Sequence, residues 1–347
     1  MTPARSTPRG AGRGASRAPV LAALDLGTNN CRMLIAQPAS KGFHVIDSFS
    51  RTVKLGEGLS RTGELSEAAI GRAVAAVKIC AQKMIRAGVT RTRAIATAAA
   101  RAARNGQELV ERLKRETGIV FDIISAKDEA QLAVTSCLPL LDRRFAAALV
   151  MDIGGGSTEL IWLDLEHFET PRLAAIVSVP VGVMSLAEKH VGTEIGAVAF
   201  ARMMEETREA LRTSGAPSFA ALGLNGERIQ LLGTSGTVTT LAGVHLGLER
   251  YDRKRVDGMW MELPAARDVV ARIAAMGREM RIAQGCVGED RADYIVPGCA
   301  IFSAIDSLWP CAALRVADRG LREGLLIGLM AEARSRRRKR RRFRRRR

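Results

Sequence analysis

The sequence predicts an α/β protein made of two related lobes with a cleft between them. The stretch LAALDLGTNNCRMLIAQ places Asp25 and Gly27 between two apolar runs, and ALVMDIGGGSTELIW repeats this layout around Asp152. Each stretch is followed by another strand-like segment and then by helical sequence. Repetition of one order of elements indicates two related units. A length of 347 residues is sufficient for both.

Both glycine-containing stretches are predicted to be β-hairpins. Thr158, Leu160 and Ile161 follow the three glycines as a second strand, whereas a dinucleotide fingerprint requires a helix there. A plain hairpin turn is the alternative, because glycine-rich hairpins are common. The repetition favours a ligand site instead. Two facing turns rich in backbone N–H groups can hold a phosphate chain from both sides, and Asp25 and Asp152 can then bind Mg²⁺.

The first lobe is expected to span residues 20–141. A third strand, FHVIDSF, leads through a glycine-rich connection to a helix capped by Ser66, whose apolar residues recur at helical spacing. TRAIAT is strand-like and GQELVERLKRET is a charged amphipathic helix. IVFDIIS is a further strand, and KDEAQLAVTSCLPLL is a helix that Pro139 ends or kinks.

The second lobe is expected to span residues 146–333, after an exposed link, DRRF. A helix begins near Met184. The later strand RIQLLG runs into TSGTVTTLAG, a Gly/Ser/Thr turn followed by a helix, and a helix N-terminus is a ready anion site. This turn is not a P-loop, because no GK[ST] follows. It is not a nucleophile elbow, because Ser235 directly precedes Gly236. The segment RVADRGLREGLLIGLMAEA is expected to be one helix.

The basic character of the chain lies in its two ends. The formal net charge is +17, residues 334–347 carry twelve Lys or Arg and no acid, and residues 1–19 carry four Arg and no acid. Removing these sixteen charges leaves +1 for residues 20–333. Runs of like charge repel, so both tails are expected to be disordered. The C-terminal tail is either a solvated appendage or a contact for nucleic acid, polyphosphate or an acidic membrane surface.

Cysteine usage and hydropathy predict a cytoplasmic protein. The six cysteines form no CxxC pair, which is typical of reduced thiols, and the four histidines show no zinc-site spacing. No apolar run reaches 18 residues, so no transmembrane helix is expected. The N-terminus lacks the apolar core of a secretory signal, and a transit peptide is the alternative to a disordered tail.

Seven motifs occur in an order that resembles a known family. They are DLGTNNCR, ATAAAR, SAKDEAQL, DIGGGSTEL, GTSGT, RADYIVPG and GLREGLL, and they extend from about Leu21 to Ala333. The sequence resembles the exopolyphosphatase / guanosine pentaphosphate phosphohydrolase (Ppx/GppA) family of the actin, Hsp70 and sugar-kinase superfamily. This resemblance implies two ribonuclease H-like lobes with an interlobe cleft. It also implies Mg²⁺-dependent release of terminal phosphate from inorganic polyphosphate, with Mn²⁺ as the alternative ion, and a homodimer.

The resemblance also implies residue roles. Glu129 corresponds to the acid that positions and activates the attacking water, and Arg101 to a basic residue that faces the polyanion beside it. Asp25, Asp152 and Glu159 correspond to metal-binding acids. The substrate-binding residues implied are Gly27, Thr28, Asn29, Asn30 and Arg32 in the first lobe, and Gly154, Gly155, Gly156, Ser157, Gly233, Thr234, Ser235, Gly236 and Thr237 in the second.

The chemistry of the residues agrees with these roles. Phosphoanhydride hydrolysis needs charge neutralisation, in-line positioning and a water held by a carboxylate. The alternative for Glu129 is an ordinary acid at a helix start, favoured by the macrodipole. Three departures from the family pattern alter side-chain contacts to substrate and leave the turns intact. Asn30 replaces a serine, Gln131 an arginine, and alanines in Ala98–Ala100 a serine and a leucine.

Other functions remain alternatives. Guanosine pentaphosphate 5′-phosphohydrolysis uses the same chemistry, although the chain ends soon after the second lobe, which favours a short polyphosphatase. An ATP-driven kinase or chaperone fits poorly with DEAQL and GLREGLL. A non-enzymatic scaffold on nucleic acid fits poorly with a sequence that keeps Asp25, Glu129, Asp152 and Glu159.

Overall fold

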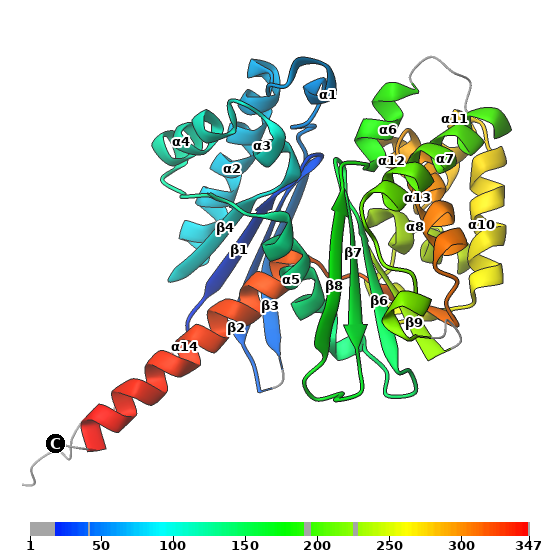
Figure 1. The fold of residues 1–347 in the computed structure, drawn as a ribbon. Helices are drawn as coiled ribbons and strands as arrows, with labels where there is room; N and C mark the ends of the chain where they lie inside the picture. The colour runs from blue at the N-terminus through cyan, green and yellow to red at the C-terminus, as the bar shows by residue number, and fades with distance from the viewer. Residues whose placement is uncertain (1–17, 41, 191–195, 225–227, 346–347) are drawn as a thin grey trace, which may run out of the picture.

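Two β-sheets form the centre of the molecule in the computed structural model, which describes residues 18–40, 42–190, 196–224 and 228–345, with the backbone alone for 336–345 (Figure 1). The strand order is β3-β2-β1-β4-β5 in the first sheet and β10-β11-β9-β6-β7-β8 in the second. The strands are β1 (Leu21–Leu26), β2 (Asn30–Pro38), β3 (Phe43–Thr52), β4 (Arg91–Ala96), β5 (Asp122–Ile123), β6 (Ala147–Ile153), β7 (Thr158–Asp164), β8 (Arg172–Val179), β9 (Ile229–Thr234), β10 (Trp260–Met261) and β11 (Ala313–Ala317).

The two sheets share one topology. In the first, β1, β2 and β3 are antiparallel and β4 and β5 add in parallel on the other side of β1. In the second, β6, β7 and β8 are antiparallel and β9 and β11 add in parallel, with β10 as an extra edge strand. The predicted repeat is therefore confirmed: each lobe is built on a ribonuclease H-like sheet that opens with a β-hairpin.

Helices cover both outer faces of the sheets and fill the space between them. Helices α2 and α4 pack outside the first sheet, α7, α8, α10 and α13 outside the second, and α5 and α14 between the two. The helices are α1 (Leu59–Thr62), α2 (Glu67–Arg86), α3 (Ala98–Ala102), α4 (Gly106–Thr117), α5 (Ala126–Cys137), α6 (Val183–Lys189), α7 (Ala197–Thr213), α8 (Gly236–His245), α9 (Arg253–Val256), α10 (Leu263–Ala275), α11 (Arg278–Ala283), α12 (Gly288–Ala292), α13 (Ile295–Leu308) and α14 (Leu321–Arg345).

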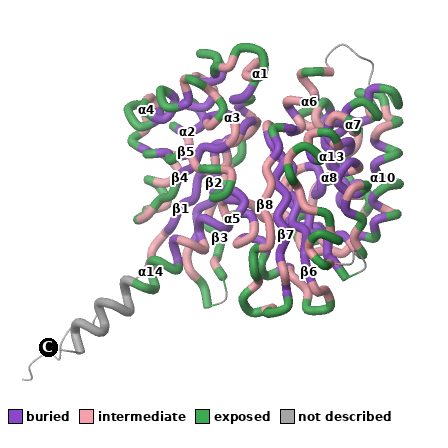
Figure 2. The backbone as a smooth tube through the Cα atoms, in the orientation of Figure 1, coloured by how far each residue is buried: buried purple, intermediate pink, exposed green. Residues whose placement is uncertain are grey.

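Strand alternation places both hairpin aspartates on the inner faces of the sheets. Along β1, Leu21 and Ala23 face α14, while Ala22 and Leu24 face α2 and α4 on the other side of the sheet. Along β6, Ala148 and Val150 face α5. Because side chains two apart share a face, the aspartate at the end of each strand continues its inner row. Figure 2 shows the central strands β1, β6 and β7 largely buried, whereas β3 and β8 at the sheet edges are half-buried or exposed.

Helix α14 leaves the second lobe and packs on the first. It follows β11, and Leu325, Leu326 and Leu329 contact the inner face of the first sheet. It crosses α5 in direct backbone contact, because a Cβ on Gly324 would lie 2.4 Å from the carbonyl oxygen of Leu132. The last helix therefore ties the two lobes together.

Two expectations for the C-terminal part differ from the structure. Residues expected at the start of the last helix form β11, because the apolar side chains of Leu314 and Val316 alternate with Arg315 and pack in the second sheet. The expected disordered tail from residue 334 continues α14 as a helix to Arg345, since Arg and Lys are good helix formers. The expectation of a disordered N-terminal tail lies almost entirely outside the described residues.

Two simpler expectations can be checked directly. All six cysteines are free thiols. Across the described ranges, none of the helices has the length and apolar character needed to cross a membrane.

Candidate active site

The two hairpin turns face each other across the interlobe cleft. In the first turn the N–H of Gly27 donates to the carbonyl oxygen of Asn30 at 2.9 Å, and in the second the N–H of Gly154 donates to that of Ser157 at 2.9 Å. The two turns therefore have the same closing hydrogen bond. Their tips are in contact, because a Cβ on Gly155 would lie 3.0 Å from the Cβ of Thr28.

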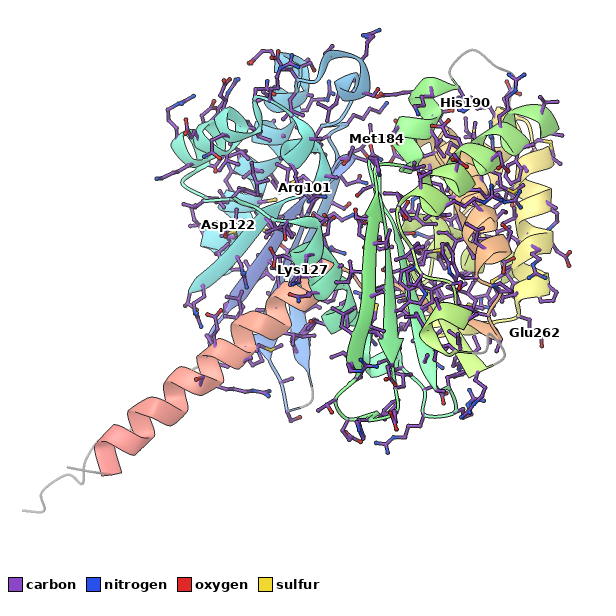
Figure 3. The ribbon with its side chains drawn as sticks, in the orientation of Figure 1. Arg101, Asp122, Lys127, Met184, His190 and Glu262 are labelled. Carbon is purple, nitrogen blue, oxygen red and sulfur yellow. The ribbon has the colours of Figure 1, made fainter. Side chains whose placement is uncertain are left out.

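The carbonyl groups of both turns are already satisfied on the side away from the cleft. The carbonyl oxygen of Asn29 accepts from the N–H groups of Val53 at 2.8 Å and Lys54 at 3.0 Å. The carbonyl oxygen of Gly155 accepts from the N–H of Met184 at 2.8 Å, at the start of α6 (Figure 3). Within the described part of the chain, the N–H groups of Thr28 and Gly155 donate no hydrogen bond. Each turn therefore presents free donors, which is the arrangement that binds phosphate.

A cavity of about 340 Å³ lies at these turns and extends into the second lobe. Of the residues predicted to form the site, it is lined by Asp25, Gly27, Thr28, Asn29, Asn30, Arg32, Glu129, Asp152, Gly154, Gly155, Gly156, Ser157, Thr234, Ser235, Gly236 and Thr237. Three predicted residues do not line it, namely Arg101, Glu159 and Gly233.

The two hairpin aspartates have different neighbours. Asp25 lies opposite Arg32 on the adjacent strand, whereas Asp152 lies opposite Glu159. Burial raises the pKa of Asp25, and the charge of Arg32 offsets part of this effect. Burial, followed by the charges of Glu159 and Asp25, raises the pKa of Asp152 to about 7. The second hairpin therefore carries an excess of negative charge at the cleft.

Glu129 enters the cavity from the first turn of α5. Ser125 caps this helix, since its side chain accepts from the N–H of Asp128 at 3.1 Å. Glu129 Oε2 accepts from Arg101 Nη1 at 3.1 Å, and the same nitrogen donates to the carbonyl oxygen of Ile124 at 2.9 Å. Arg101 thus orients Glu129 from α3, above the start of α5 (Figure 3). Burial, then the charge of Glu159, raises the pKa of Glu129 to about 8.

Glu159 lies behind the cavity wall. It is buried in β7 beneath α5, and its Oε1 accepts from the hydroxyl of Ser178 at 2.7 Å. The sequence placed Glu159 among the residues that contact the ion directly. The charge of Glu159 raises the pKa values of Glu129 and Asp152, and a direct contact with an ion stays a prediction.

The turn between β9 and α8 forms a third wall of the cavity. Ser235 has φ of 113°, a strained value for a residue with a side chain, and its buried hydroxyl finds no hydrogen-bond partner among the described residues. Such strain is concentrated at functional sites. Arg291 lies at the same helix start, where its Cζ would be 3.9 Å from a Cβ on Gly236 and its Nη1 donates to Thr240 at 2.8 Å. A helix N-terminus with a guanidinium beside it favours an anion.

Several cavity residues had been given no role from the sequence. Arg322, in the first turn of α14, makes no hydrogen bond or ion pair with any described residue, and neither does Arg32. Tyr251 donates to Asp318 at 2.8 Å, and Tyr294 also lines the cavity. Arg291 and Tyr294 belong to the motif RADYIVPG, and Arg322 belongs to GLREGLL. Both motifs were recognised in the sequence, but no role was given to these three residues.

A carboxylate bridges the two lobes at the mouth of the cleft. Glu188 of α6 accepts from the N–H of Gly58 at 3.0 Å and from the hydroxyl of Ser60 at 3.0 Å. Both partners belong to the first lobe at α1, which faces α6 in Figure 1. The lobes are therefore joined at the mouth by side-chain contacts as well as at the base by α5 and α14.

The metal-binding prediction can be compared with the geometry. Within the described residues, no three His, Cys, Asp or Glu side chains could hold a metal ion by themselves. Asp25 Oδ1 is a buried atom with no hydrogen-bond partner in the part of the chain that the structure describes. Mg²⁺ usually takes one or two carboxylates together with phosphate oxygens and water. The Asp25 and Asp152 pair fits that ion.

Comparison with known proteins identifies the family. The Ppx/GppA phosphatase family matches residues 34–333 of this chain. The chain belongs to the Ppx/GppA phosphatase family. It is 27% identical over 313 residues to a guanosine-5′-triphosphate,3′-diphosphate pyrophosphatase of Aeromonas salmonicida, which covers 90% of this chain and 60% of that protein. It thus spans well under two thirds of that relative's length.

This chain matches two further proteins over nearly the whole of their length. A putative exopolyphosphatase of Haemophilus influenzae is 28% identical to this chain over 319 residues. The match covers 89% of this chain and 91% of that protein. The crystal structure of an exopolyphosphatase from Cytophaga hutchinsonii matches with a TM-score of 0.80 and 26% identity, covering 90% of this chain and 98% of that one. The two-lobed fold is therefore that of the family.

Proposed function

We propose that this protein is an exopolyphosphatase that releases the terminal phosphate of inorganic polyphosphate. The observation that carries the proposal is the meeting of two N–H turns, two half-buried aspartates and Glu129 in one cavity. Such a cavity offers donors on opposite sides of a phosphate chain and a carboxylate beside it. Hydrolysis of a phosphoanhydride bond needs little more than this positioning and charge stabilisation.

The cationic side chains neutralise the substrate. Arg32 and Arg322 line the cavity and make no hydrogen bond or ion pair with any described residue, so both guanidinium groups are available to the phosphate oxygens. Arg is suited to this role because its planar guanidinium can donate two hydrogen bonds to one phosphate. Arg291 and the start of α8 would hold phosphates further along the chain.

Glu129 would orient the attacking water and accept its proton. A general base is most effective when its pKa is near the working pH, and burial has raised the pKa of Glu129 towards neutrality. Arg101 would act as a positioning residue, because it contacts Glu129 and does not line the cavity.

Asp25 and Asp152 would hold Mg²⁺, with Mn²⁺ as the alternative ion. When bound, the ion would neutralise charge on the phosphate oxygens. Glu159, whose charge acts on Asp152, would strengthen the negative potential at this position. Homodimer formation and a cytoplasmic location stay predictions.

Guanosine pentaphosphate is the second candidate substrate, and a specific feature favours it. Tyr251 and Tyr294 both line the cavity and offer aromatic surface for a base. The Aeromonas relative is named for this activity. Polyphosphate takes precedence because the cavity walls at both turns are made of phosphate-binding elements.

The test is phosphate release from long-chain polyphosphate, guanosine pentaphosphate and ATP, each with Mg²⁺, with Mn²⁺ and with a chelator. We expect the highest kcat/KM for polyphosphate and loss of activity with the chelator. A higher kcat/KM for guanosine pentaphosphate would assign the second function. Release from none of the three would reject hydrolysis altogether.

A further inference from the structure

One side chain joins the two lobes at the mouth of the cleft, and the proposed chemistry gives it no role. Glu188 of α6 accepts from the N–H of Gly58 through Oε1 at 3.0 Å and from the hydroxyl of Ser60 through Oε2 at 3.0 Å. Both carboxylate oxygens of this second-lobe residue are therefore used by α1 of the first lobe. We call this contact the mouth latch.

On the first-lobe side, the mouth latch is connected by backbone contacts to the first hairpin turn, residues 27–30. The N–H of Gly56, two residues before Gly58, donates to the carbonyl oxygen of Thr28 at 3.0 Å. A Cβ on Gly56 would lie only 2.4 Å from Cγ2 of Thr28, so the two segments pack without a gap. A displacement of α1 therefore moves the first turn as well.

On the second-lobe side, α6 begins directly on the second hairpin turn, residues 154–157. The N–H of Val183, the first residue of the helix, donates to the carbonyl oxygen of Gly154 at 3.0 Å. A Cβ on Gly182 would lie 2.5 Å from the carbonyl oxygen of Gly155, so helix and turn are in backbone contact. Glu188 follows on the same helix, roughly 8 Å beyond Val183 at 1.5 Å per residue. The position of α6 is therefore tied to that of the second turn.

The segment that carries α1 is also fixed within its own lobe. Arg72 of α2 donates from Nε to the carbonyl oxygen of Val53 at 2.8 Å and from Nη2 to Glu57 at 2.7 Å. Arg104 donates from Nη2 to the carbonyl oxygen of Thr62 at 3.0 Å. Because the segment is held on both sides of α1, it moves with the first lobe and not as an independent flap.

The mouth latch lies opposite the elements that join the lobes at the base. Helices α5 and α14 pack between the two sheets, whereas α1 and α6 face each other above α5 in Figure 1. A rotation of the lobes about this base displaces the mouth most. Opening would therefore break the mouth latch and separate the two turns in one movement, as in other proteins that close around a ligand by hinge motion.

We propose that Glu188 is a positioning residue that keeps the two hairpin turns at the separation at which both donate to one phosphate chain. This inference rests on the proposed function and adds a residue to the same site. A carboxylate suits the task because it repels phosphate and so leaves the substrate to the turns. Two hydrogen bonds are also weak enough to break, which permits the lobes to open for substrate entry and phosphate release.

The test compares three variants of the full chain. Glu188→Ala removes both hydrogen bonds of the mouth latch, and Ser60→Ala removes one of them. Lys189→Ala is the matched control, because Lys189 is the next residue of α6 and its ion pair with Glu206 stays within the second lobe. For each variant, kcat and KM are measured with tripolyphosphate and Mg²⁺, and the unfolding temperature reports whether the fold is intact.

The separation of the lobes is measured independently of activity. Spin labels are attached at Glu111→Cys in α4 and Glu209→Cys in α7, two exposed positions on different lobes. Cys311→Ser accompanies them, because that thiol is half-buried whereas the other five cysteines are buried. Pulsed electron paramagnetic resonance then gives the distance between the labels in the protein without ligand.

We expect Glu188→Ala to give longer and more broadly distributed label distances. KM should rise by about tenfold, because a smaller fraction of closed molecules weakens apparent binding in proportion. The value of kcat should stay within about twofold of the wild type, since saturating substrate restores the closed arrangement. Ser60→Ala should raise KM by about threefold, because one hydrogen bond remains. Lys189→Ala should change neither the distances nor KM.

Unchanged label distances in Glu188→Ala would overturn the proposal, and so would an unchanged KM, since the turns would then keep their separation without the mouth latch. An equal rise of KM in Lys189→Ala would also overturn it, because the effect would belong to α6 in general. If the wild type releases no phosphate, the proposed function fails separately, and Kd for tripolyphosphate from calorimetry takes the place of KM. Equal Kd values for the wild type and Glu188→Ala would then reject the positioning role.

Discussion

The two hairpins of the cleft share a backbone and differ in what their side chains do. The first turn places Thr28 where the second has Gly155, and Arg32 where the second has Glu159. At the point of contact, Thr28 fills the space that the glycines leave: a Cβ on Gly156 would lie 3.0 Å from Thr28 Oγ1. This explains the run of three glycines. The second turn must be small because the first turn lies against it.

The two hairpins differ in the charges of their paired side chains. Arg32 balances Asp25 in the first hairpin, whereas Asp152 and Glu159 add to one another in the second. A repeated fold has thus been turned into an asymmetric site. In the proposed function, one side would donate hydrogen bonds and positive charge to phosphate, and the acids of the other would hold a cation.

The largest effect is expected at Glu129, which lies where the acids of the second hairpin meet the first lobe. Glu129→Gln keeps the size of the side chain and removes its ability to accept a proton. We expect phosphate release to fall ~10²–10⁴-fold, with substrate binding close to that of the wild type. The unfolding temperature near neutral pH should not fall, because a buried acid with a raised pKa is replaced by a neutral group. The measurement is kcat together with Kd for polyphosphate. Activity within threefold of the wild type would contradict the assignment.

A smaller effect, on stability, is expected when equivalent glycines of the two turns are replaced by alanine. A Cβ on Gly154 would lie 2.9 Å from the carbonyl oxygen of Ser157, whereas a Cβ on Gly27 would lie 3.5 Å from that of Asn30. Gly154→Ala forces the backbone apart and should destabilise the protein by ~1–3 kcal/mol. Gly27→Ala serves as the matched control and should be neutral or slightly stabilising, because alanine restricts the unfolded chain. Thermal and urea unfolding measure both, and equal losses would refute the asymmetry of the turns.

The last prediction concerns how the stability of the protein depends on pH when no divalent cation is bound. The pKa of Asp152 is raised from its ordinary 3.8 to about 7 and that of Glu129 from 4.5 to about 8. Between about pH 4 and pH 8 the folded state therefore binds more protons than the unfolded state. Stability should fall as pH rises through this window and level off above it.

Unfolding temperature measured with a chelator from pH 4.5 to 8.5 tests this slope. Glu129→Gln should flatten it, because one of the titrating groups is removed. Addition of Mg²⁺ at pH 8 should raise the unfolding temperature if the ion binds the folded state. A rise of stability with pH in the wild type would show that these acids are ionised at lower pH than the structure indicates.

The sequence alone determined the local parts of the site. The apolar runs of β1 and β6 and the glycines after them were enough to predict two hairpins with an aspartate at each turn. The segment KDEAQLAVTSCLPLL was predicted to be the helix that carries Glu129, because it begins with acids. These features depend on residues within a few positions of each other, where period and turn chemistry are decisive.

The tertiary structure decided which of these residues meet. Nothing local in GLREGLL indicates that Arg322 enters the cavity, or that the helix after it packs on the first sheet through Leu325 and Leu329. Glu159 pairs with Asp152 in register, yet it does not line the cavity, and α5 packs against its strand β7. Such outcomes depend on contacts between segments that are far apart in the sequence or belong to different elements. They are set by how apolar faces fit together in space, and no pattern within one segment contains that information.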